Sequence, residues 1–101
     1  MASLTEIVKQ EVFWYAGGGS KVKYLPFANE IEQAYTVNVI DTPERRQPAG
    51  VVVLARVIGD YIVIEEDLTD RPLVDRLVAA GIPREKIILA YAGEPLPDIS
   101  R

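Results

Sequence analysis

Residues 51–67 read VVVLARVIGDYIVIEED, and this stretch decides the fold class. Its first part, up to residue 58, is almost wholly apolar and rich in β-branched side chains, which is typical of a strand at the centre of a sheet. Gly59 and Asp60 separate it from a second apolar segment, which begins at Tyr61. This is the spacing of a two-residue hairpin with glycine at the first central position. The two segments are therefore predicted to be antiparallel neighbours.

A helix is predicted over residues 3–15. Ser3 and Glu6 have the spacing of a capping box, in which two side chains bind free backbone N–H groups reciprocally. The buried stripe at helical spacing is expected to contain Leu4, Ile7, Val8 and Val12, continued by Tyr15. Residues 17–19 are glycines, and we expect them to end the helix because glycine adopts the left-handed conformation without strain. Since the GGGS segment closes a helix and does not follow a strand, a helix stop is favoured over a phosphate-binding loop.

Two further strands are predicted before the hairpin. Residues 21–27 read as extended but contain Pro26, which restricts them to an edge strand or to no strand. Residues 32–42 alternate in polarity, as a strand with one buried face does. The residues expected on that face are Tyr35, Val37 and Val39. Residues 43–50, with two prolines and a glycine, are predicted to form a loop.

A second helix and a last strand are predicted after the hairpin. Thr69 or Asp70 can cap the helix, and Pro72 suits its first turn, where a missing N–H group costs nothing. Gly81 is expected to stop the helix. The apolar face is predicted to contain Leu73, Val74, Leu77, Val78 and Ala80. Residues 87–91 follow as a short strand, and the tail over residues 93–101 is expected to be loosely held.

Together these elements predict an α+β protein. An N-terminal helix is followed by an antiparallel sheet of about four strands, a second helix and a final strand. At this length a single domain over residues 1–101 is expected. Both helices can then cover the same face of the sheet.

The composition excludes several kinds of site. The chain has no histidine and no cysteine, so it lacks the usual general base at neutral pH, the usual zinc ligands and any thiolate. Its formal net charge is −4, from 11 basic and 15 acidic residues. A protein that binds DNA alone usually carries a basic stripe, because phosphate neutralisation supplies most of the affinity. Direct nucleic-acid binding by the chain alone is therefore not expected, and no cofactor is expected either.

The sequence also indicates the compartment in which the protein is expected. No apolar run approaches the roughly 20 residues that a membrane-spanning helix needs. The N-terminal stretch MASLTEIVKQ lacks the basic flank and the apolar block of a signal peptide. A cytoplasmic protein without a membrane partner is expected.

Three adjacent carboxylates, Glu65, Glu66 and Asp67, end the predicted strand shortly before Asp70. Regular alternation places Glu65 and Asp67 on one face and Glu66 on the other. Two carboxylates plus water could hold magnesium, but no Asp/Glu-x-Lys pair lies on a predicted strand to complete a nuclease site. Asp67 and Asp70 also precede a helix, whose dipole stabilises negative charge by about 0.3–1 kcal/mol. A capping or surface role is favoured, and a metal site is the alternative.

The candidate partner-binding residues are an aromatic residue and a basic pair. Phe13, Trp14 and Tyr15 follow one another on the predicted helix and point about 100° apart, so they cannot all pack against one sheet. Trp14 is expected to be partly exposed, and exposed tryptophan is enriched at protein interfaces. Arg45 and Arg46 form an adjacent basic pair in the predicted loop. Their guanidinium groups can bind phosphate or a partner's carboxylate, or remain solvated.

The segment DYIVIEEDLTDRPLVDRLVAAGIPREKIILAYAGE, residues 60–94, resembles the C-terminal half of the XisI-like family, the fdxN element excision controlling factors of cyanobacteria. In that family a strand of the type I-x-I-Q-x-D leads through a threonine into a short helix ending in A-G-[IV]-P-[KR]-E-x-I-[IV]-L. The matching residues here are Ile62, Ile64, Asp67, Thr69, Leu77, Ala80, Gly81, Ile82, Pro83, Arg84, Glu85, Ile87, Ile88 and Leu89. Val63 and Glu65 replace an aromatic residue and a glutamine that are common there, which indicates a divergent member.

The resemblance implies an accessory role. Such a factor helps a site-specific recombinase to remove a DNA element during heterocyst differentiation, together with a companion protein of nuclease-like fold. The family offers no catalytic residues to carry over to this chain. An acidic accessory that acts through a protein partner agrees with the negative charge, the missing histidines and the aromatic triplet.

The leading hypothesis is therefore a non-enzymatic accessory protein that acts by protein contact through Trp14 and the arginine pair. One alternative is a metal-dependent hydrolase or nuclease that uses Glu65, Asp67 and Asp70. Another is a homo-oligomeric scaffold whose exposed sheet face is its own interface.

Overall fold

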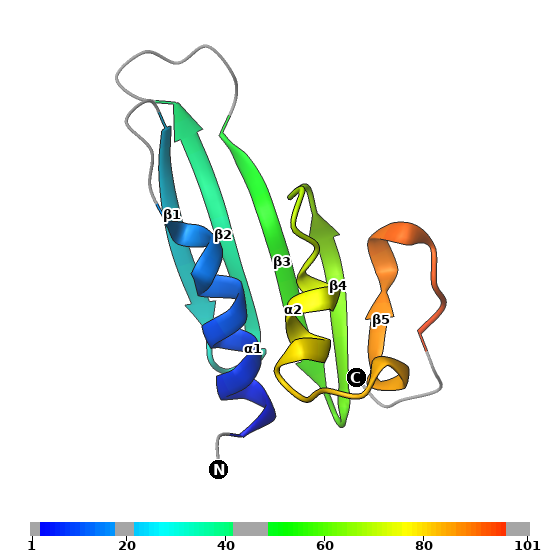
Figure 1. Ribbon diagram of the computed structural model, residues 1–101. Helices are drawn as coiled ribbons and strands as arrows, with labels where there is room; N and C mark the ends of the chain where they lie inside the picture. The colour runs from blue at the N-terminus through cyan, green and yellow to red at the C-terminus, as the bar shows by residue number, and fades with distance from the viewer. Residues whose placement is uncertain (1–2, 18–21, 42–48, 97–101) are drawn as a thin grey trace.

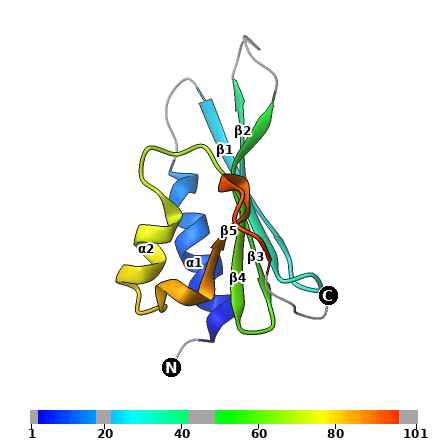
Figure 2. The same cartoon turned by 90° about the vertical axis from the view of Figure 1, so that its right-hand side faces the viewer.

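The structure, a computed structural model, describes residues 3–17, 22–41 and 49–96. Five strands form one sheet in the order β1-β2-β3-β4-β5, and both α-helices lie on the same face of it (Figures 1 and 2). The elements in chain order are α1 (Leu4–Phe13), the 3₁₀ helix η1 (Trp14–Ala16), β1 (Val22–Asn29), β2 (Ala34–Asp41), β3 (Gly50–Ile58), β4 (Tyr61–Asp67), α2 (Leu73–Ala79), the 3₁₀ helix η2 (Arg84–Lys86), β5 (Ile87–Leu89) and the 3₁₀ helix η3 (Ala90–Ala92).

The antiparallel hairpin predicted from residues 51–67 is confirmed. β3 pairs with β4 in antiparallel register, with Ile58 opposite Tyr61. Gly59 lies in the turn between them at a φ of 60°, a left-handed value that glycine adopts without strain. β3 is the third strand of the five, which agrees with its almost continuous apolar sequence. β1 lies at an edge of the sheet, as Pro26 requires.

The last strand makes the sheet a mixed one. β5 pairs with β4 in parallel, with Ile62 opposite Ile87. α2 forms the crossover between them, so β4, α2 and β5 make a β-α-β unit at the end of an antiparallel meander. The predicted α+β order is thus confirmed, with five strands in the sheet. β5 ends at Leu89, earlier than predicted, and the chain turns into η3.

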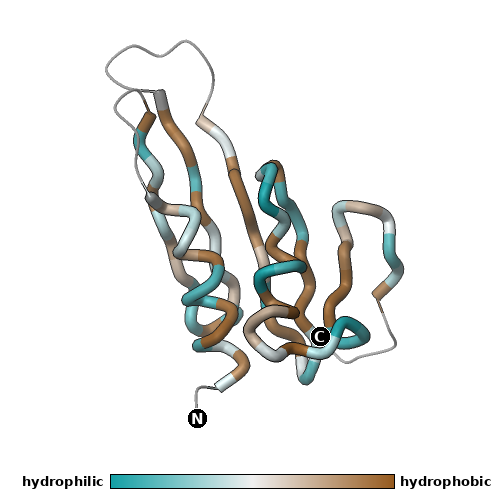
Figure 3. The backbone as a smooth tube through the Cα atoms, viewed as in Figure 1, coloured by the Kyte–Doolittle hydropathy of each residue, from teal (hydrophilic) through white to brown (hydrophobic). Residues whose placement is uncertain are grey.

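The core lies between the sheet and the two helices. α1 contributes Val8 and Val12, α2 contributes Leu73 and Leu77, and all are fully buried. The buried residues that pack with them are Tyr35, Val37, Val53, Ala55, Val57, Ile62, Ile64, Ile82 and Ile87. Figure 3 shows the corresponding apolar stretches along β3, β4 and β5. One continuous core therefore joins both halves of the chain.

The predicted apolar face of α2 is partly wrong. The helix is two turns long and buries Leu73 and Leu77, which are spaced i and i+4. Val78 is 45% exposed, and Ala80 is also exposed. So short a helix turns only one narrow stripe toward the sheet, and a residue 100° from Leu77 points away from that stripe. Gly81 ends the helix as predicted, with a φ of 100°.

α1 begins as predicted and ends in a different way. The Ser3 hydroxyl oxygen accepts a hydrogen bond from the backbone N–H of Glu6 at 3.2 Å. At the other end α1 passes into η1, and Gly17 follows in an extended conformation with φ −62° and ψ 124°. Gly17 therefore does not adopt the expected left-handed conformation, because the tighter 3₁₀ turn has already closed the helix. Residues 18–21 lie outside the described residues.

The cap of α2 is Asp67, several residues before the helix begins. Its Oδ2 atom accepts a hydrogen bond from the backbone N–H of Leu73 at 2.8 Å. Its Oδ1 atom accepts bonds from the backbone N–H and the hydroxyl of Thr69, at 2.9 and 2.6 Å. The prediction that Thr69 or Asp70 caps α2 is therefore wrong. The Thr69 hydroxyl points back toward Asp67 and the carbonyl of Arg71, and Asp67 takes the first helical N–H group.

Glu94 fixes the chain after η3. Its carboxylate accepts a hydrogen bond from the backbone N–H of Leu89 at 2.8 Å and forms an ion pair with Arg84 at 3.1 Å. The bond from the Leu89 amide is the main reason why the pKa of Glu94 lies below its usual range. The anchored chain thus extends beyond Gly93, where the sequence predicts a loosely held tail to begin. Residues 97–101 lie outside the described residues.

Replacing the cap should destabilise the protein. Asp67→Ala removes the acceptor of the Leu73 N–H group and the support of Thr69, so the free energy of unfolding should fall by about 1–2 kcal/mol. Urea unfolding followed by circular dichroism measures the change. Asp70→Ala is the matched control and should stay within about 0.5 kcal/mol of the wild type. Equal losses in the two variants would contradict the assignment of the cap.

Candidate functional site

The carboxylates at the end of β4 do not follow regular strand alternation. The β3–β4 register shifts between Leu54 and Ala55, which leaves Glu65 as the extra residue of a β-bulge. A bulge reverses the alternation of the residues that follow it. Glu65 and Asp67, predicted to share a face, therefore point to opposite faces of the sheet.

Each of these carboxylates has its own surroundings. Glu65 forms a 2.6 Å ion pair with Arg56, which alternates with buried residues of β3 and so lies on the face away from the helices. Asp67 lies on the helix-covered face, where it caps α2. Glu66 accepts a 3.2 Å bond from the backbone N–H of Asp67, and Asp70 is exposed in the loop before α2. The bulge thus places Glu65 and Asp67, which the sequence predicts on one face, on opposite faces of the sheet.

The separation of these carboxylates argues against the alternative of a metal site. Within residues 3–17, 22–41 and 49–96, no three acidic, histidine or cysteine side chains converge to hold a metal ion. Glu65, Asp67 and Asp70 would have to abandon an ion pair and a helix cap to come together. The capping interpretation of Asp67 is confirmed, whereas Asp70 lies exposed at the surface and accepts no capping bond among the described residues.

The three consecutive aromatic residues divide as predicted. Phe13 packs edge-on against the buried Tyr35, with ring centroids 6.5 Å apart. Tyr15 is half-buried against the core. Trp14 remains 44% exposed, which confirms the expected partial exposure. Its role in partner binding stays a prediction.

Two arginines hold the exposed indole in place. The guanidinium carbon of Arg76 lies 3.8 Å from the centre of the Trp14 ring, and that of Arg71 lies 5.7 Å from it. Arg76 also forms a 2.8 Å ion pair with Glu11 of α1. Stacking of a guanidinium on tryptophan is attractive by about 0.5–1 kcal/mol at exposed sites. Trp14 is therefore an ordered surface residue at the junction of η1 and α2.

Tyr15 ties η1 to the loop before α2. Its hydroxyl donates a hydrogen bond to the backbone carbonyl of Arg71. Burial of the ring, followed by the negative charge of Asp67, raises the pKa of Tyr15 to about 12. The phenol therefore stays neutral and able to donate this bond at physiological pH.

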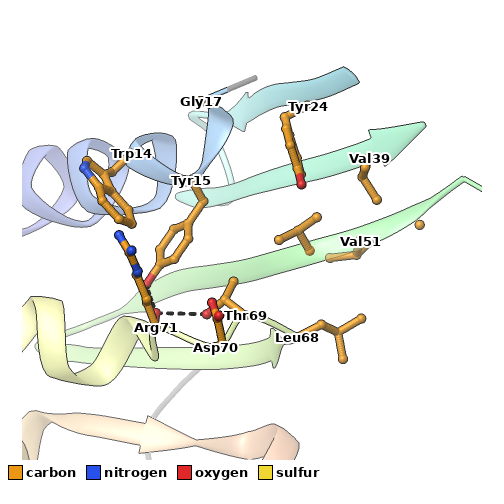
Figure 4. Close-up of a pocket in the computed structure, with 12 residues that line it drawn as sticks. Trp14, Tyr15, Gly17, Tyr24, Val39, Val51, Leu68, Thr69, Asp70 and Arg71 are labelled. Carbon is orange, nitrogen blue, oxygen red and sulfur yellow. Dashed lines mark hydrogen bonds between the residues drawn. The ribbon is translucent and has the colours of Figure 1, made fainter. Parts of the chain in front are cut away.

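A groove with a volume of about 950 Å³ opens beside Trp14 (Figure 4). η1 forms one wall, residues 68–71 form the opposite wall, and the ends of β1, β2 and β3 form the floor. The apolar lining residues include Trp14, Tyr15, Tyr24, Val51 and Leu68. The volume lies within the range of roughly 300–1,000 Å³ that is typical of ligand pockets.

The groove exists because neither helix reaches this end of the sheet. η1, which continues α1, ends at Ala16, and α2 begins at Leu73. β2 and β3 extend past both helices (Figure 1). A second bulge in the β2–β3 ladder, between Val37 and Asn38, leaves Val52 as an extra residue and adds local twist. The strand ends therefore keep apolar side chains that α1 and α2 do not cover.

The groove was not evident from sequence patterns. Its walls and floor come from five separate segments of the chain. The one local signal is Leu68, an apolar residue at the start of a polar loop, which is 72% exposed. Arg45 and Arg46 lie outside the described residues, so Trp14 alone represents the predicted contact surface.

The fold and the groove define a small α+β protein, an antiparallel meander extended by a β-α-β unit, with one helix-covered face. In the parts of the chain that the structure describes, no helix has the length and apolarity needed to cross a membrane. The chain belongs to the XisI family, because the family model described as XisI protein matches residues 3–98. The resemblance seen over residues 60–94 is therefore confirmed, and it extends to the N-terminal helix and the first strands.

Two solved structures share the fold. A XisI-like protein from Anabaena variabilis superposes with a TM-score of 0.71 at 24% identity, covering 84% of this chain and 81% of that one. The fdxN element excision controlling factor XisI from Anabaena variabilis gives a TM-score of 0.62 at 24% identity, with 87% and 85% covered. No curated protein sequence matches the chain significantly. At this level of identity, the two structures establish the fold.

The raised pKa of Tyr15 should appear in the pH dependence of stability. The folded-state pKa of about 12 exceeds the ordinary value of 10, so the neutral phenol stabilises the fold fully below pH 10. This contribution is lost as the pH rises from 10 toward 12. Urea unfolding across this alkaline range should show a steeper loss for the wild type than for Tyr15→Phe. Parallel profiles would contradict the environment assigned to Tyr15.

Proposed function

We propose that the chain is a non-enzymatic accessory factor in the excision of a DNA element, acting inside the cell through a protein partner. The observation that carries this proposal is the XisI family match over residues 3–98. A solved relative with the same fold is named as the fdxN element excision controlling factor. The finer parts of the proposal, namely the absence of catalysis and the use of a partner, are supported by the chemistry of this chain.

The distribution of polar groups supports a non-catalytic role. The chain offers no imidazole and no thiol, which removes the usual bases and nucleophiles. Of the acidic residues at the end of β4, Glu65 is paired with Arg56 and Asp67 is used as a helix cap. A metal-dependent hydrolase would need carboxylates that converge, and the bulge at Glu65 turns them apart.

The net charge of the chain and the exposed Trp14 support contact with DNA through a protein partner. A net charge of −4 opposes binding to phosphate, so contact with DNA calls for a partner that brings its own basic surface. A nuclease-like companion of the excision system would be such a partner. Trp14 offers it an ordered, half-exposed aromatic side chain, the kind of residue that dominates binding energy at interfaces.

Removing the indole should weaken the partner contact. In Trp14→Ala, affinity for the partner captured from the cells that produce the chain should fall about tenfold or more, because a buried tryptophan at an interface is commonly a hot spot. Affinity capture with a tagged chain, followed by mass spectrometry and titration of the identified partner, measures the effect. The Arg45→Ala, Arg46→Ala double variant tests the predicted basic pair in the same assay.

The matched control is Ile31→Ala. Ile31 is 94% exposed in the turn between β1 and β2, so this variant removes a comparable exposed apolar side chain at another place. Circular dichroism and the unfolding midpoint show whether each variant is folded. Undiminished capture by folded Trp14→Ala would refute the assignment of the contact, and capture of no specific partner by the wild type would refute the accessory role.

Metal titration tests the non-enzymatic part of the proposal. Calorimetric titration with magnesium or manganese should show no stoichiometric binding, because Glu65, Asp67 and Asp70 do not converge. Glu65→Gln and Asp67→Asn should give the same flat titration as the wild type. Binding of one metal ion per chain that either variant abolishes would favour the hydrolase alternative.

A further inference from the structure

The walls of the groove are tied together before any ligand arrives. The backbone N–H of Leu68 donates a 2.8 Å bond to the carbonyl of Val52, which fastens the start of the loop to β3. The hydroxyl of Tyr15 donates to the carbonyl of Arg71, and Asp67 holds Thr69 within the loop. The loop is thereby joined to β3 on one side and to η1 on the other. A ligand would therefore meet a largely preformed surface, and little free energy would be lost in ordering it.

Exposed apolar side chains gather around this groove. Of the seven large hydrophobic residues that are exposed among the described residues, three line it: Trp14, Val51 and Leu68. Their exposed fractions are 44%, 36% and 72%. Grouped apolar exposure in a concave site marks a binding surface more strongly than scattered exposed residues do. An apolar side chain of a ligand fits these walls.

The groove also carries an exposed negative charge at Asp70. Asp70 and Arg71 are the charged residues among those that line it. The Arg71 guanidinium is directed to the face of Trp14, as Figure 4 shows. Asp70 makes no ion pair and no side-chain hydrogen bond with any residue in the described ranges. A cationic group of a ligand would therefore complement the charge of Asp70.

We propose that the groove binds a short segment of a protein partner that presents an apolar side chain next to a lysine or arginine. The apolar side chain packs between Trp14, Val51 and Leu68, and the cationic group pairs with Asp70. A basic segment also suits a chain whose net charge is −4, because complementary charge steers association. The inference rests on the proposed function only in taking the ligand to be a protein.

Three matched peptides test the groove without the natural partner. Acetylated and amidated GKLFKG, GELFEG and GQLFQG differ only in flanking charge and contain no tryptophan or tyrosine. Trp14 is the single tryptophan of the chain and lines the groove, so its fluorescence reports binding. We expect the lysine peptide to bind with a Kd on the order of 0.1 mM. The glutamine peptide should bind about threefold more weakly and the glutamate peptide more weakly still.

Variants of Asp70 and Leu68 then test which residues cause the preference for the lysine peptide and the binding itself. Asp70→Asn should remove the preference for lysine over glutamine, and Asp70→Lys should make the glutamate peptide the better ligand. Leu68→Ser should weaken all three peptides about tenfold, because it removes an apolar wall. Asp60→Asn, in the exposed turn between β3 and β4, is the control for charge and should leave the preference unchanged. Unfolding midpoints confirm that each variant is folded.

Several outcomes would overturn the proposal. They are equal binding of the three peptides, preference for glutamate, no binding of any peptide, and light scattering that shows a dimer broken by Asp70→Lys. Failure of the peptide test together with Trp14-dependent capture of a partner would refute the groove assignment alone. Lysine-selective peptide binding with no partner captured from cells would leave the groove assignment intact and refute the accessory role.

Discussion

The hydrogen bond from the backbone N–H of Leu73 to the carboxylate of Asp67 organises the C-terminal half of the structure. It is possible because the bulge at Glu65 turns Asp67 toward the helix-covered face of the sheet. This bond joins the end of β4 to the start of α2. With α2 anchored there, Leu77 packs against the sheet and β5 returns in parallel beside β4. A regular ladder would have pointed Asp67 to the opposite face and left the first turn of α2 without its acceptor.

The same aspartate links stability to the candidate site. By binding Thr69 as well as Leu73, Asp67 shapes the loop that forms one wall of the groove. Tyr15 joins that loop from the other side, and the nearby charge of Asp67 contributes to its raised pKa. One wall of the groove is therefore held by the same carboxylate that caps α2. A surface held this firmly suits recognition of a segment from another molecule more than it suits a mobile catalytic loop.

Several charged side chains join elements of the fold, while seven large hydrophobic residues among those described remain exposed. Ion pairs such as Arg56 with Glu65 and Arg76 with Glu11 join neighbouring elements. Arg76 in turn positions the indole of Trp14 at the surface. This arrangement agrees with the accessory role proposed above for this member of the XisI family. The net charge of −4 and the exposed Asp70 are the features on which the proposed preference for a basic segment rests.

The features that depend on short spacings could be predicted from the sequence. These include the hairpin at Gly59 and Asp60, the edge position imposed by Pro26, the Ser3 cap and the family motif over residues 60–94. Each follows from residues within a few positions of one another. The tertiary structure alone decided the parallel direction of β5, the bulge, the choice of Asp67 as cap and the groove. All of these depend on which distant segments lie side by side. Several carboxylates stood near the start of α2, and only the register of β4 against β3 selected the one that reaches its first N–H group.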